Sequence, residues 1–350
     1  MAGGVKRVRA AALESFVARI FVAAGTPAAD AATVAEVLVW ANLRGVDSHG
    51  VLRVPGYVGR IESGEFNPRP DIAAIAELPA ATLIDADRAF GPVGMSRGMD
   101  IAIAKAREAG VGVCIVRRVT HMAAMGWFAL RAVDAGMIGL AFGSSRPNMA
   151  YHGARARGVA TSPIAIAVPG EDAPVLLDMA TSESSMGRIM LARDSGTPLE
   201  PGWALTEDGT PTTDADAARM LTPLGGAKGA GLALMFECLT GVLVGHPLIA
   251  TAIGPDAETR HSQNGFALAI DIAAFAEPER YRRDIAALVA ALKALPVAEG
   301  HDGIRLPGER GERMMAERLL AGVPLPDGTW RRLAEVAGGL GVEMPPVIEG

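Results

Sequence analysis

Cysteine is nearly absent from the chain. Only Cys114 and Cys238 occur among the 350 residues, so a disulfide framework is excluded as the basis of the fold. The two cysteines do not have the spacing of a zinc-binding pair, and the H-E-x-x-H pattern of zinc proteases is missing. We therefore expect a protein of a reducing compartment, the cytoplasm, that uses no metal.

Aromatic residues and positive charge are also scarce. Phe, Trp and Tyr make up 5% of the chain, so the core must be built mainly from Ala, Val, Leu, Ile and Met. The formal net charge of −6 argues against a surface that binds nucleic acid or an anionic membrane. The hydrophobic share of 50% and the charged share of 21% are typical of a globular protein. At about 100–200 residues per domain, the length predicts two domains.

Uninterrupted hydrophobic runs are missing as well. The basic opening of the chain resembles the start of a signal peptide, but Glu14 and Arg19 interrupt the apolar part that would follow. A later apolar stretch is long enough to cross a bilayer, which takes about 20 residues. Because it contains Glu237 and is broken by Pro247, we predict a buried helix that ends near Gly245, and no membrane partner.

The common nucleotide-binding motifs are not found. The chain has neither the G-x-x-x-x-G-K-[ST] sequence of P-loop proteins nor the G-x-G-x-x-G sequence that opens a Rossmann domain. If a dinucleotide binds, it therefore binds outside a Rossmann fingerprint.

The spacing of apolar residues predicts the main helices and strands. Helical spacing covers residues 8–24, and Thr26 caps a second helix with Pro27 at its first position. A further helix is predicted over 94–109. Short apolar strands are predicted at 110–119, 137–145, 160–170, 174–182 and 265–271.

Helices dominate both ends of the chain, and the middle mixes helices with strands. We therefore predict an α/β protein in which a mixed α/β domain, 119–300, is inserted in a helical domain made of 1–118 plus 301–350.

A candidate catalytic group lies in the stretch "LRGVDSHGVLRVPGYV". An imidazole such as that of His49 exchanges protons near neutral pH, so it can act as a general acid or base. The hydroxyl of Ser48 can orient that ring or bond a substrate oxygen, and Arg53 can hold a carboxylate through two hydrogen bonds. A structural alternative stays open, because helices often end at glycine and a polar residue there is merely solvated.

The other histidines divide into two groups. His121, in "VTHMAAMGWFAL", follows a predicted strand and begins a helix rich in small residues, where backbone is open to a ligand. His152 lies in a glycine-bounded loop that could line a pocket. For His246, His261 and His301 we expect solvated structural roles.

A glycine-rich segment, "LTPLGGAKGAGLALMFE", forms a candidate anion site. Gly225, Gly226, Gly229 and Gly231 leave backbone N–H groups open where an apolar helix begins, and Lys228 adds a cation. Such a helix start suits a phosphate or pyrophosphate. The alternative is that the glycines allow close packing of the helix.

Seven stretches in register resemble the malate/L-lactate dehydrogenase family of the second, non-Rossmann type. They are "LRGVDSHGVLRVPGYV", "THMAAMGWF", "TSPIAIAVP", "LLDMATS", "PLGGAKGAGLALMFE", "QNGFALAID" and "RLPGER". That family includes ureidoglycolate dehydrogenase, sulfolactate dehydrogenase, diketogulonate reductase and a cyclic-imine reductase. The resemblance implies an NAD(P)-dependent oxidoreductase with an unusual nucleotide-binding α/β domain. It also implies a homodimer with active sites near the subunit boundary.

The resemblance assigns roles to individual residues. It implies that His49 is the proton donor and acceptor, that Ser48 assists it, and that Arg53 binds the substrate carboxylate. Further substrate contacts are implied for His121, Thr161 and Tyr57. Cofactor contacts are implied for His121, Met122, Ala123, Ala124, Ser145, Asp178, Met179, Ala180, Ala227, Lys228, Pro307, Gly308 and Glu309.

Some residues depart from the pattern of the family. The segment "HMAAMG" stands where the family often has H-F-G-A-A-G, and Tyr151 and His152 replace a Pro-Trp pair near the expected pocket. Arg188 stands where the cyclic-imine branch has an aspartate that supports the catalytic pair. This leaves the group that orients His49 unassigned and favours a hydroxy-acid substrate over an imine.

The sequence thus predicts hydride transfer between a nicotinamide and C2 of a small 2-hydroxy or 2-oxo acid. Two alternatives stay open. The first is a reductase of a cyclic imine such as piperideine-2-carboxylate or pyrroline-2-carboxylate, and the second is a nucleotide-binding protein without catalysis. The cofactor is NAD or NADP, and we favour NAD.

Overall fold

The first two helices form from apolar residues at helical spacing. The computed structural model describes residues 5–249 and 262–348; in it α1 spans Ala10–Ala23 and α2 spans Ala28–Leu43. Both helices confirm the prediction. Their fully buried residues include Leu13, Phe16, Val17, Ile20 and Phe21 on α1, and Val34, Val37, Leu38 and Ala41 on α2.

The start of α2 differs from the prediction by one residue. Pro27, not Thr26, is the N-cap, because its backbone is extended (φ −56°, ψ 145°) and the helical conformation begins only at Ala28. The Pro27 carbonyl accepts a hydrogen bond from the amide of Ala31 at 2.9 Å. The Thr26 hydroxyl is buried and has no hydrogen-bond partner within the described part of the chain, so it caps nothing.

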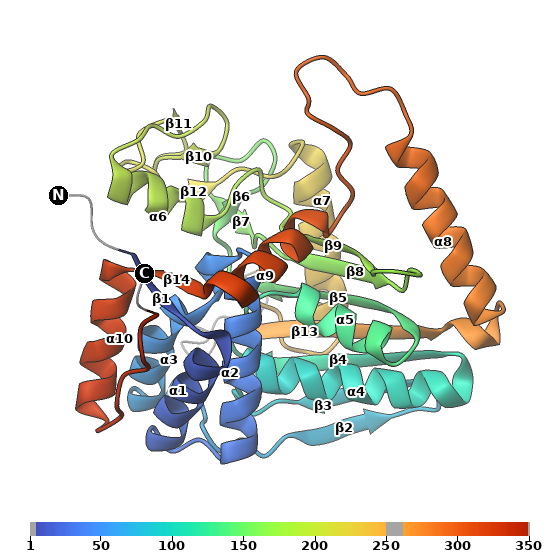
Figure 1. Cartoon of the computed structure of the whole chain (residues 1–350), viewed down its shortest axis with the longest axis horizontal. Coiled ribbons are helices and arrows are strands. Elements are labelled where there is room, and N and C mark those ends of the chain that lie inside the picture. Colours follow the sequence, from blue (N-terminus) through green and yellow to red (C-terminus); the bar gives the residue numbers. More distant parts are fainter. Residues whose placement is uncertain (1–4, 250–261, 349–350) are drawn as a thin grey trace.

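Segments from both ends of the chain build one helical layer. β1 (Val5–Val8) pairs antiparallel with β14 (Val323–Pro326). Helices α3 (Val54–Glu62) and α10 (Asp327–Gly339) pack beside α1 and α2, on the left of Figure 1. A single buried hydrophobic cluster contains side chains from all six elements.

A seven-stranded sheet lies beside this layer, in the order β2-β3-β4-β13-β5-β8-β9. Neighbouring strands are antiparallel except for the parallel pair β3–β4. The strands predicted from the sequence are all present, and the mixed α/β fold class is confirmed. The strands are β2 (Ala73–Glu77), β3 (Ala81–Asp85), β4 (Val111–Val119), β5 (Met137–Ser145), β8 (Ile164–Val168), β9 (Val175–Met179) and β13 (Gln263–Asp271).

Helices cover both faces of the sheet. On one face, α4 (Gly91–Ala109) lies over β4 and β13, and α5 (Gly126–Asp134) lies over β5 and β8. Gly112 lets α4 approach closely, since a Cβ there would stand 2.0 Å from the carbonyl oxygen of Ala102. On the other face is α7 (Ala227–Glu237), whose Phe236 ring stacks on the ring of Phe142 from β5 at 4.4 Å.

The sheet crosses the domain boundary predicted at residue 118. Strands β2 and β3 and all but the last residue of β4 lie before that boundary, and β4 pairs with β13, which lies after it. The first 118 residues therefore supply strands of the large sheet as well as helices. The division into 1–118 plus 301–350 and 119–300 stays a prediction.

Helix α7 continues into a π-helical turn, η3 (Cys238–Val242), and the chain turns at Gly245 as predicted. The prediction that this helix is buried is wrong for one of its two sides. One side packs on the sheet, and the other side is exposed. The exposed apolar side chains, with 38–64% of their surface accessible, are Leu232, Met235, Leu239, Val242 and Leu243. In the described ranges no helix combines the length and the apolar character needed to cross a membrane.

The remaining elements surround the sheet. A small sheet in the order β11-β10-β12-β6-β7 lies above the large one in Figure 1, next to α6 (Met186–Ser195). Helix α8 (Pro278–Lys293) stands apart from the body after the short η5 (Ile272–Ala274), and none of its residues is buried. Helix α9 (Glu309–Ala321) returns to the helical layer. The small strands are β6 (Met149–Ala150), β7 (Arg157–Val159), β10 (Ala204–Leu205), β11 (Pro211–Thr212) and β12 (Met220–Leu221).

Candidate active site

Five strand ends meet at one edge of the large sheet. Val119, Gln263 and Ser145 lie side by side across β4, β13 and β5. Ile164 and Met179 pair where β8 begins and β9 ends. The loops after β4, β5 and β9 therefore emerge at the same edge as the segments that lead into β8 and β13. Nine of the predicted site residues lie on these loops or at the strand ends beside them: His121, Met122, Ala123, Ala124, Ser145, Thr161, Asp178, Met179 and Ala180.

The candidate catalytic residues lie on two short 3-10 turns between α2 and α3, which we call the catalytic turn. The first turn, η1, is Asp47–His49, and the second, η2, is Val51–Arg53. Ser48 and His49 thus lie just past the end of a rigid helix, as predicted.

The three predicted residues of this turn are in contact. Ser48 Oγ lies 2.9 Å from His49 Nδ1, and the Nε–H of Arg53 donates to the backbone carbonyl of Ser48 at 2.7 Å. The Ser48 hydroxyl thus fixes one edge of the imidazole and leaves Nε2 for another partner. Within the described residues no carboxylate pairs with the Arg53 guanidinium, so its outer N–H groups are available to an anion.

His121 stacks directly on His49. The two rings are nearly parallel, with centroids 5.6 Å apart and an angle of 16° between their planes. The structure therefore joins two histidines that lie far apart in the sequence. Together with Arg53, whose charge acts on both rings, they form a group of one cation and two imidazoles.

Tyr57 holds His121 from the side opposite the solvent. Its hydroxyl lies 2.6 Å from His121 Nδ1 and 3.3 Å from the carbonyl oxygen of the same residue. Only 1% of Tyr57 is exposed, because its ring packs in an aromatic cluster with Phe21, Phe66 and Phe90. Tyr57 therefore reaches the site through His121.

Burial and the nearby guanidinium shift the ionisation of these groups. Loss of water contact, together with the charge of Arg53, lowers the pKa of His49 to about 4. The same two causes, joined by the neighbouring His49, lower the pKa of His121 well below its usual value. Burial raises the pKa of the Tyr57 phenol. At neutral pH the site thus holds two uncharged imidazoles and an uncharged phenol beside one cation.

The segment after β4 is an irregular loop, so the prediction that His121 begins a helix is wrong. Helix α5 starts only at Gly126, and Ala123 has a left-handed backbone with φ +57°. The Gln263 side chain accepts a hydrogen bond from the amide of Met122 at 3.2 Å and so holds the loop to the sheet. The Asp178 carboxylate accepts from the amide of Gly126 at 2.8 Å and occupies the start of α5.

The predicted cofactor residues form one band along the edge of the sheet. Met122 and Ser145 both contact Gln263, and Asp178 joins β9 to the loop after β4. The carbonyl of Pro307 accepts from the amide of Leu176 on β9 at 3.3 Å. The neighbouring members are buried or half-buried: Ala123, Ala124, Met179, Ala180, Gly308 and Glu309.

The last two cofactor candidates, Ala227 and Lys228, lie at the exposed start of α7. This start is tied to the band, because the carbonyl of Thr181, just past β9, accepts from the amide of Leu224 at 2.9 Å. The ammonium group of Lys228 has no ion-pair partner within the described residues. One amide of the predicted anion site is already taken, since Glu183 Oε1 accepts from Gly225 N at 2.7 Å.

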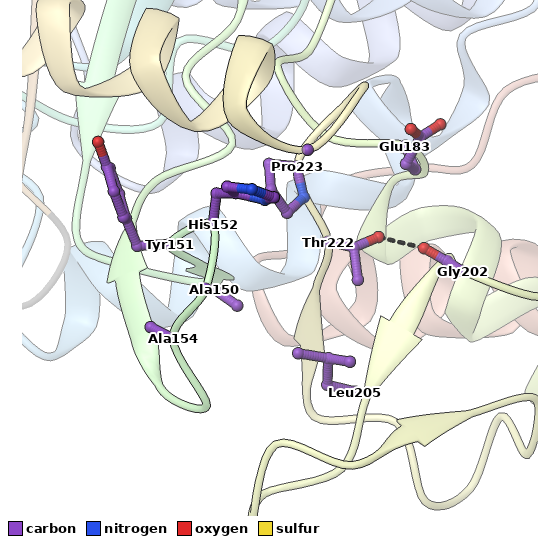
Figure 2. Close-up of a pocket in the computed structure, with 11 residues that line it drawn as sticks. Ala150, Tyr151, His152, Ala154, Glu183, Gly202, Leu205, Thr222 and Pro223 are labelled. Carbon is purple, nitrogen blue, oxygen red and sulfur yellow. Dashed lines mark hydrogen bonds between the residues drawn. The ribbon is translucent and has the colours of Figure 1, made fainter.

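A cavity of about 270 Å³ opens beside the start of α7. Figure 2 shows His152 next to Pro223, with Tyr151 on one side and Glu183 on the other. The His152 ring rests on Gly226, where a Cβ would stand 3.1 Å from Nδ1. His152 therefore lines a cavity, as expected, and Glu183 lines the same cavity although the sequence analysis did not identify it.

Thr161 and the residues 187 and 188 lie outside the catalytic turn. Thr161 and Asn148 are joined by two hydrogen bonds, from Thr161 N to Asn148 Oδ1 at 2.9 Å and from Asn148 Nδ2 to Thr161 Oγ1 at 3.3 Å. Gly187 on α6 faces Ser48, because a Cβ there would stand 2.6 Å from Ser48 Cβ. The next residue, Arg188, places its guanidinium over the ring of Trp203 at 5.6 Å.

The other histidines have structural surroundings. His246 is not solvated as expected, because its Nδ1 lies 3.0 Å from Asn264 Oδ1 in a partly buried position. His301 is exposed as predicted. His261 lies outside the described residues.

Sequence reasoning missed the residues that hold the catalytic turn. Asn42 Nδ2 donates to Asp47 Oδ1 at 2.6 Å, and Asn42 Oδ1 accepts from Val51 N at 2.8 Å. Arg318 on α9 contacts the same aspartate. Asp47 precedes Ser48 and could have been singled out by position, but Asn42 and Arg318 carry no local signal.

Comparison with known proteins gives consistent matches over nearly the whole chain. A family model described as malate/L-lactate dehydrogenase matches residues 8–334. Malate dehydrogenase of Pyrococcus horikoshii is 37% identical over 95% of this chain and 94% of its own length. Ureidoglycolate dehydrogenase (NAD(+)) of Escherichia coli is 33% identical over 89% and 90%. The structure of delta1-piperideine-2-carboxylate reductase from Pseudomonas syringae superposes with a TM-score of 0.82 and 27% identity, covering 95% of this chain and all (100%) of that one.

Proposed function

The chain belongs to the malate/L-lactate dehydrogenase family and is a dehydrogenase of that type; from this premise we propose that it moves a hydride between NAD(P) and C2 of a small 2-hydroxy or 2-oxo acid. The observation that carries the proposal is a group of contacting side chains. His49 stacks on His121 and contacts Ser48, and Arg53 lies in the same turn and donates to the carbonyl of Ser48. One cation beside two neutral imidazoles suits a substrate that has a carboxylate next to an oxygen that gains or loses a proton.

The residues of the band fit a dinucleotide. Small side chains at Ala123 and Ala124 leave backbone close to the stacked histidines, and the start of α7 with Lys228 offers N–H groups and a cation for phosphates. When bound there, the nicotinamide supplies or accepts the hydride. We assign Pro307, Gly308 and Glu309 to the cofactor site as well, because Pro307 is hydrogen-bonded to β9.

In the reducing direction Arg53 holds the substrate carboxylate through its outer N–H groups. His49, protonated when the substrate carboxylate offsets the charge of Arg53, then gives its Nε2 proton to the oxygen on C2 and becomes neutral, while its Nδ1 stays at Ser48 Oγ. His121, fixed by Tyr57, donates a hydrogen bond to the same oxygen and stabilises the charge that develops there. In the oxidising direction neutral His49 takes the proton back. Thr161 and the small residues around it form the wall of the substrate site.

The test is a panel of 2-oxo acids, with NADH or NADPH oxidation followed by absorbance. We expect turnover of at least one acid, loss of kcat in His49→Ala, and a raised KM in Arg53→Ala. Full turnover by His49→Ala would remove the proposed acid, and unchanged constants in Arg53→Ala would remove the carboxylate site. Binding of cofactor without turnover of any compound would favour a non-catalytic nucleotide-binding protein.

A cyclic-imine reductase is the second candidate, favoured by the likeness to delta1-piperideine-2-carboxylate reductase. The residue at position 188 argues against this candidate. It is Arg188, whose guanidinium lies over Trp203, and not the aspartate that supports the catalytic pair in the cyclic-imine branch. Turnover of piperideine-2-carboxylate in preference to every 2-oxo acid would select this candidate.

We propose NAD as the preferred cofactor. The support for this choice is that a relative, ureidoglycolate dehydrogenase of Escherichia coli, is named as NAD(+)-dependent. The ratio of kcat/KM for NADH to that for NADPH tests this choice.

We further propose a cytoplasmic homodimer. Both cysteines are unpaired, which suits a reducing compartment. The exposed apolar side of α7 and η3 is the surface we assign to a second copy of the chain, since isolated apolar patches of this kind mark protein contacts. The proposed domain division, 1–118 plus 301–350 against 119–300, then separates a substrate part from a cofactor part, and the surface that we assign to the second copy lies on the cofactor part.

A further inference from the structure

Helix α9 is fastened at both ends to the segment that leads into the catalytic turn. Near its start, the Arg44 Nη2 group donates to the carbonyl of Gly308 at 3.1 Å, and Nη1 pairs with Glu312. Near its end, Arg318 reaches Asp47, the first residue of the turn. The helix therefore connects the proposed cofactor segment with the proposed catalytic residues.

The contact between Arg318 and Asp47 is a fork of two parallel hydrogen bonds. Nη1 lies 2.7 Å from Oδ1 and Nη2 lies 3.0 Å from Oδ2. Nη1 also donates to the backbone carbonyl of Asn42 at the end of α2. Such a planar pair fixes direction as well as distance, which a single contact would not do.

Asn42 completes the attachment from the other side. Its amide group donates to Asp47, and its oxygen accepts from Val51, so one side chain spans both 3-10 turns. Gly50 leaves room for it, because a Cβ there would stand 2.1 Å from Asn42 Oδ1. Turns of three residues have poor hydrogen-bond geometry of their own, so outside contacts must define this one.

We propose that Arg318 and Asp47 form a latch by which α9 holds the catalytic turn, and that both are positioning residues for Ser48 and His49. The inference rests on the proposed function, since it takes these two residues as the ones that act on substrate. The sequence left the group that orients His49 unassigned. The latch supplies such a group indirectly, because it orients the turn that carries His49. Neither Arg318 nor Asp47 is placed in contact with substrate.

The latch should affect catalysis more than stability. The Arg318 side chain is 11% exposed but that of Asp47 is 48% exposed, and a half-exposed ion pair adds little to the stability of a fold. Position is more sensitive: a displacement of about 1 Å at a reacting group can lower a rate about 100-fold. Since Ser48 and His49 follow Asp47 directly, a loosened turn moves them first.

The first experiment compares two positions on α9. In Arg318→Met we expect kcat to fall about 10- to 100-fold, with the melting temperature and the Kd for NADH, from fluorescence quenching, near those of the wild type. Arg318→Lys keeps the charge without the fork and should retain more turnover than Arg318→Met. Arg313→Met, at an exposed position of the same helix, is the matched control and should keep wild-type constants.

A double-mutant cycle separates the latch from two independent effects. Asp47→Asn keeps the shape of the side chain and removes its charge. If the two residues act through each other, the double variant Asp47→Asn/Arg318→Met loses no more kcat than Arg318→Met alone. Losses that multiply would show two separate roles and overturn the latch.

A readout that needs no activity follows His49 itself. With 13C-labelled histidine, the His49 signal is identified by its absence in His49→Gln. In Arg318→Met we expect this signal to shift and its titration midpoint to rise, because a loosened turn admits water to the ring; Arg313→Met should leave both unchanged. An unchanged His49 signal in Arg318→Met overturns the inference. If the wild type turns over no compound of the panel, the proposed function fails while this measurement still decides the latch.

Discussion

Two uncharged imidazoles lie beside one guanidinium in this site, and this arrangement determines when His49 can accept or donate a proton. The low pKa of His49 means that the ring is a base over most of the pH range, and that it becomes an acid only when the negative charge of a bound substrate raises its pKa. The Arg53 guanidinium, which we propose as the group that holds the substrate carboxylate, contributes to lowering that pKa. A bound carboxylate would offset part of this effect, so substrate binding itself prepares the proton transfer.

The pH dependence of hydroxy-acid oxidation tests this assignment. Because kcat/KM reports the free enzyme, it should stay level from pH 8 to about 5 and fall as His49 becomes protonated near pH 4. The sign follows from the lowered pKa: the base form is present above about 4 and lost below it. Initial rates of NAD⁺ reduction measure this. A decline that begins near 6.5, the value of a free imidazole, would contradict the assignment.

Tyr57→Phe tests the support of His121. The change removes the hydroxyl that lies 2.6 Å from Nδ1 and leaves a buried nitrogen without its partner. An unsatisfied buried group costs about 1–3 kcal/mol, so we expect kcat/KM to fall about 10-fold or more. Tyr281→Phe is the control, since that ring lies on α8, away from the site. Equal constants for Tyr57→Phe and wild type would show that His121 needs no such support.

Residues close in sequence could be predicted, and residues joined only by the fold could not. Ser48, His49 and Arg53 occupy one turn, so their chemistry was visible in one quoted stretch. The contact of Tyr57 with His121 spans 64 positions, and that of Arg318 with Asp47 spans 271. Neither pair has a local pattern, because the contact exists only after α3 and α9 have packed in place.

Among the elements, the catalytic turn depends on close packing against α2. Gly50→Ala would place a Cβ 2.1 Å from the Asn42 oxygen and push this side chain away from the turn. We expect a loss of about 1–3 kcal/mol in the free energy of unfolding, measured by urea denaturation, together with a fall in kcat.

Gly59→Ala is the matched control on the next helix. A Cβ at Gly59 meets nothing within 4 Å, and alanine favours a helix over glycine by about 0.5–1 kcal/mol. This variant should be as stable as the wild type or slightly more so, with unchanged turnover. If both alanines had the same effect, packing against Asn42 would not be what fixes the turn.

Element types were easier to predict than their ends. Helices α1, α2 and α4 and the strands β4, β5, β8, β9 and β13 follow from apolar spacing, because burial of one face decides them, whereas β2 and β3 were not predicted. The start of α5 was placed too early, since Gln263 and Asp178 hold residues 122–126 in an irregular loop through contacts from distant strands. The burial of α7 was overestimated because an apolar stretch does not tell whether the sheet or another chain covers it.

At the scale of the whole molecule, the exposed apolar side of α7 and η3 predicts association. We expect light scattering to give twice the chain mass of 36.1 kDa. Leu239→Glu on this side should shift the mass toward one chain, because a buried charge without a partner is costly in an interface. Leu78→Glu, at an exposed leucine between β2 and β3, should leave the mass unchanged. A monomeric wild type would contradict the prediction.

The order of strands in the large sheet could not be read from the sequence. Each strand is apolar and short, so several orders would bury them equally well. Only the observed register shows β13 placed between β4 and β5. The domain boundary drawn at residue 118 therefore divides strands that share hydrogen bonds.

That central place of β13 also constrains how the protein is made. While a ribosome is still adding the segment before Gln263, β4 and β5 have both emerged without the strand that separates them. Their facing edges then offer unpaired N–H and C=O groups to any neighbouring nascent chain. Synthesis must reach Asp271, more than three quarters of the way along the 350 residues, before the sheet can close against such misassembly.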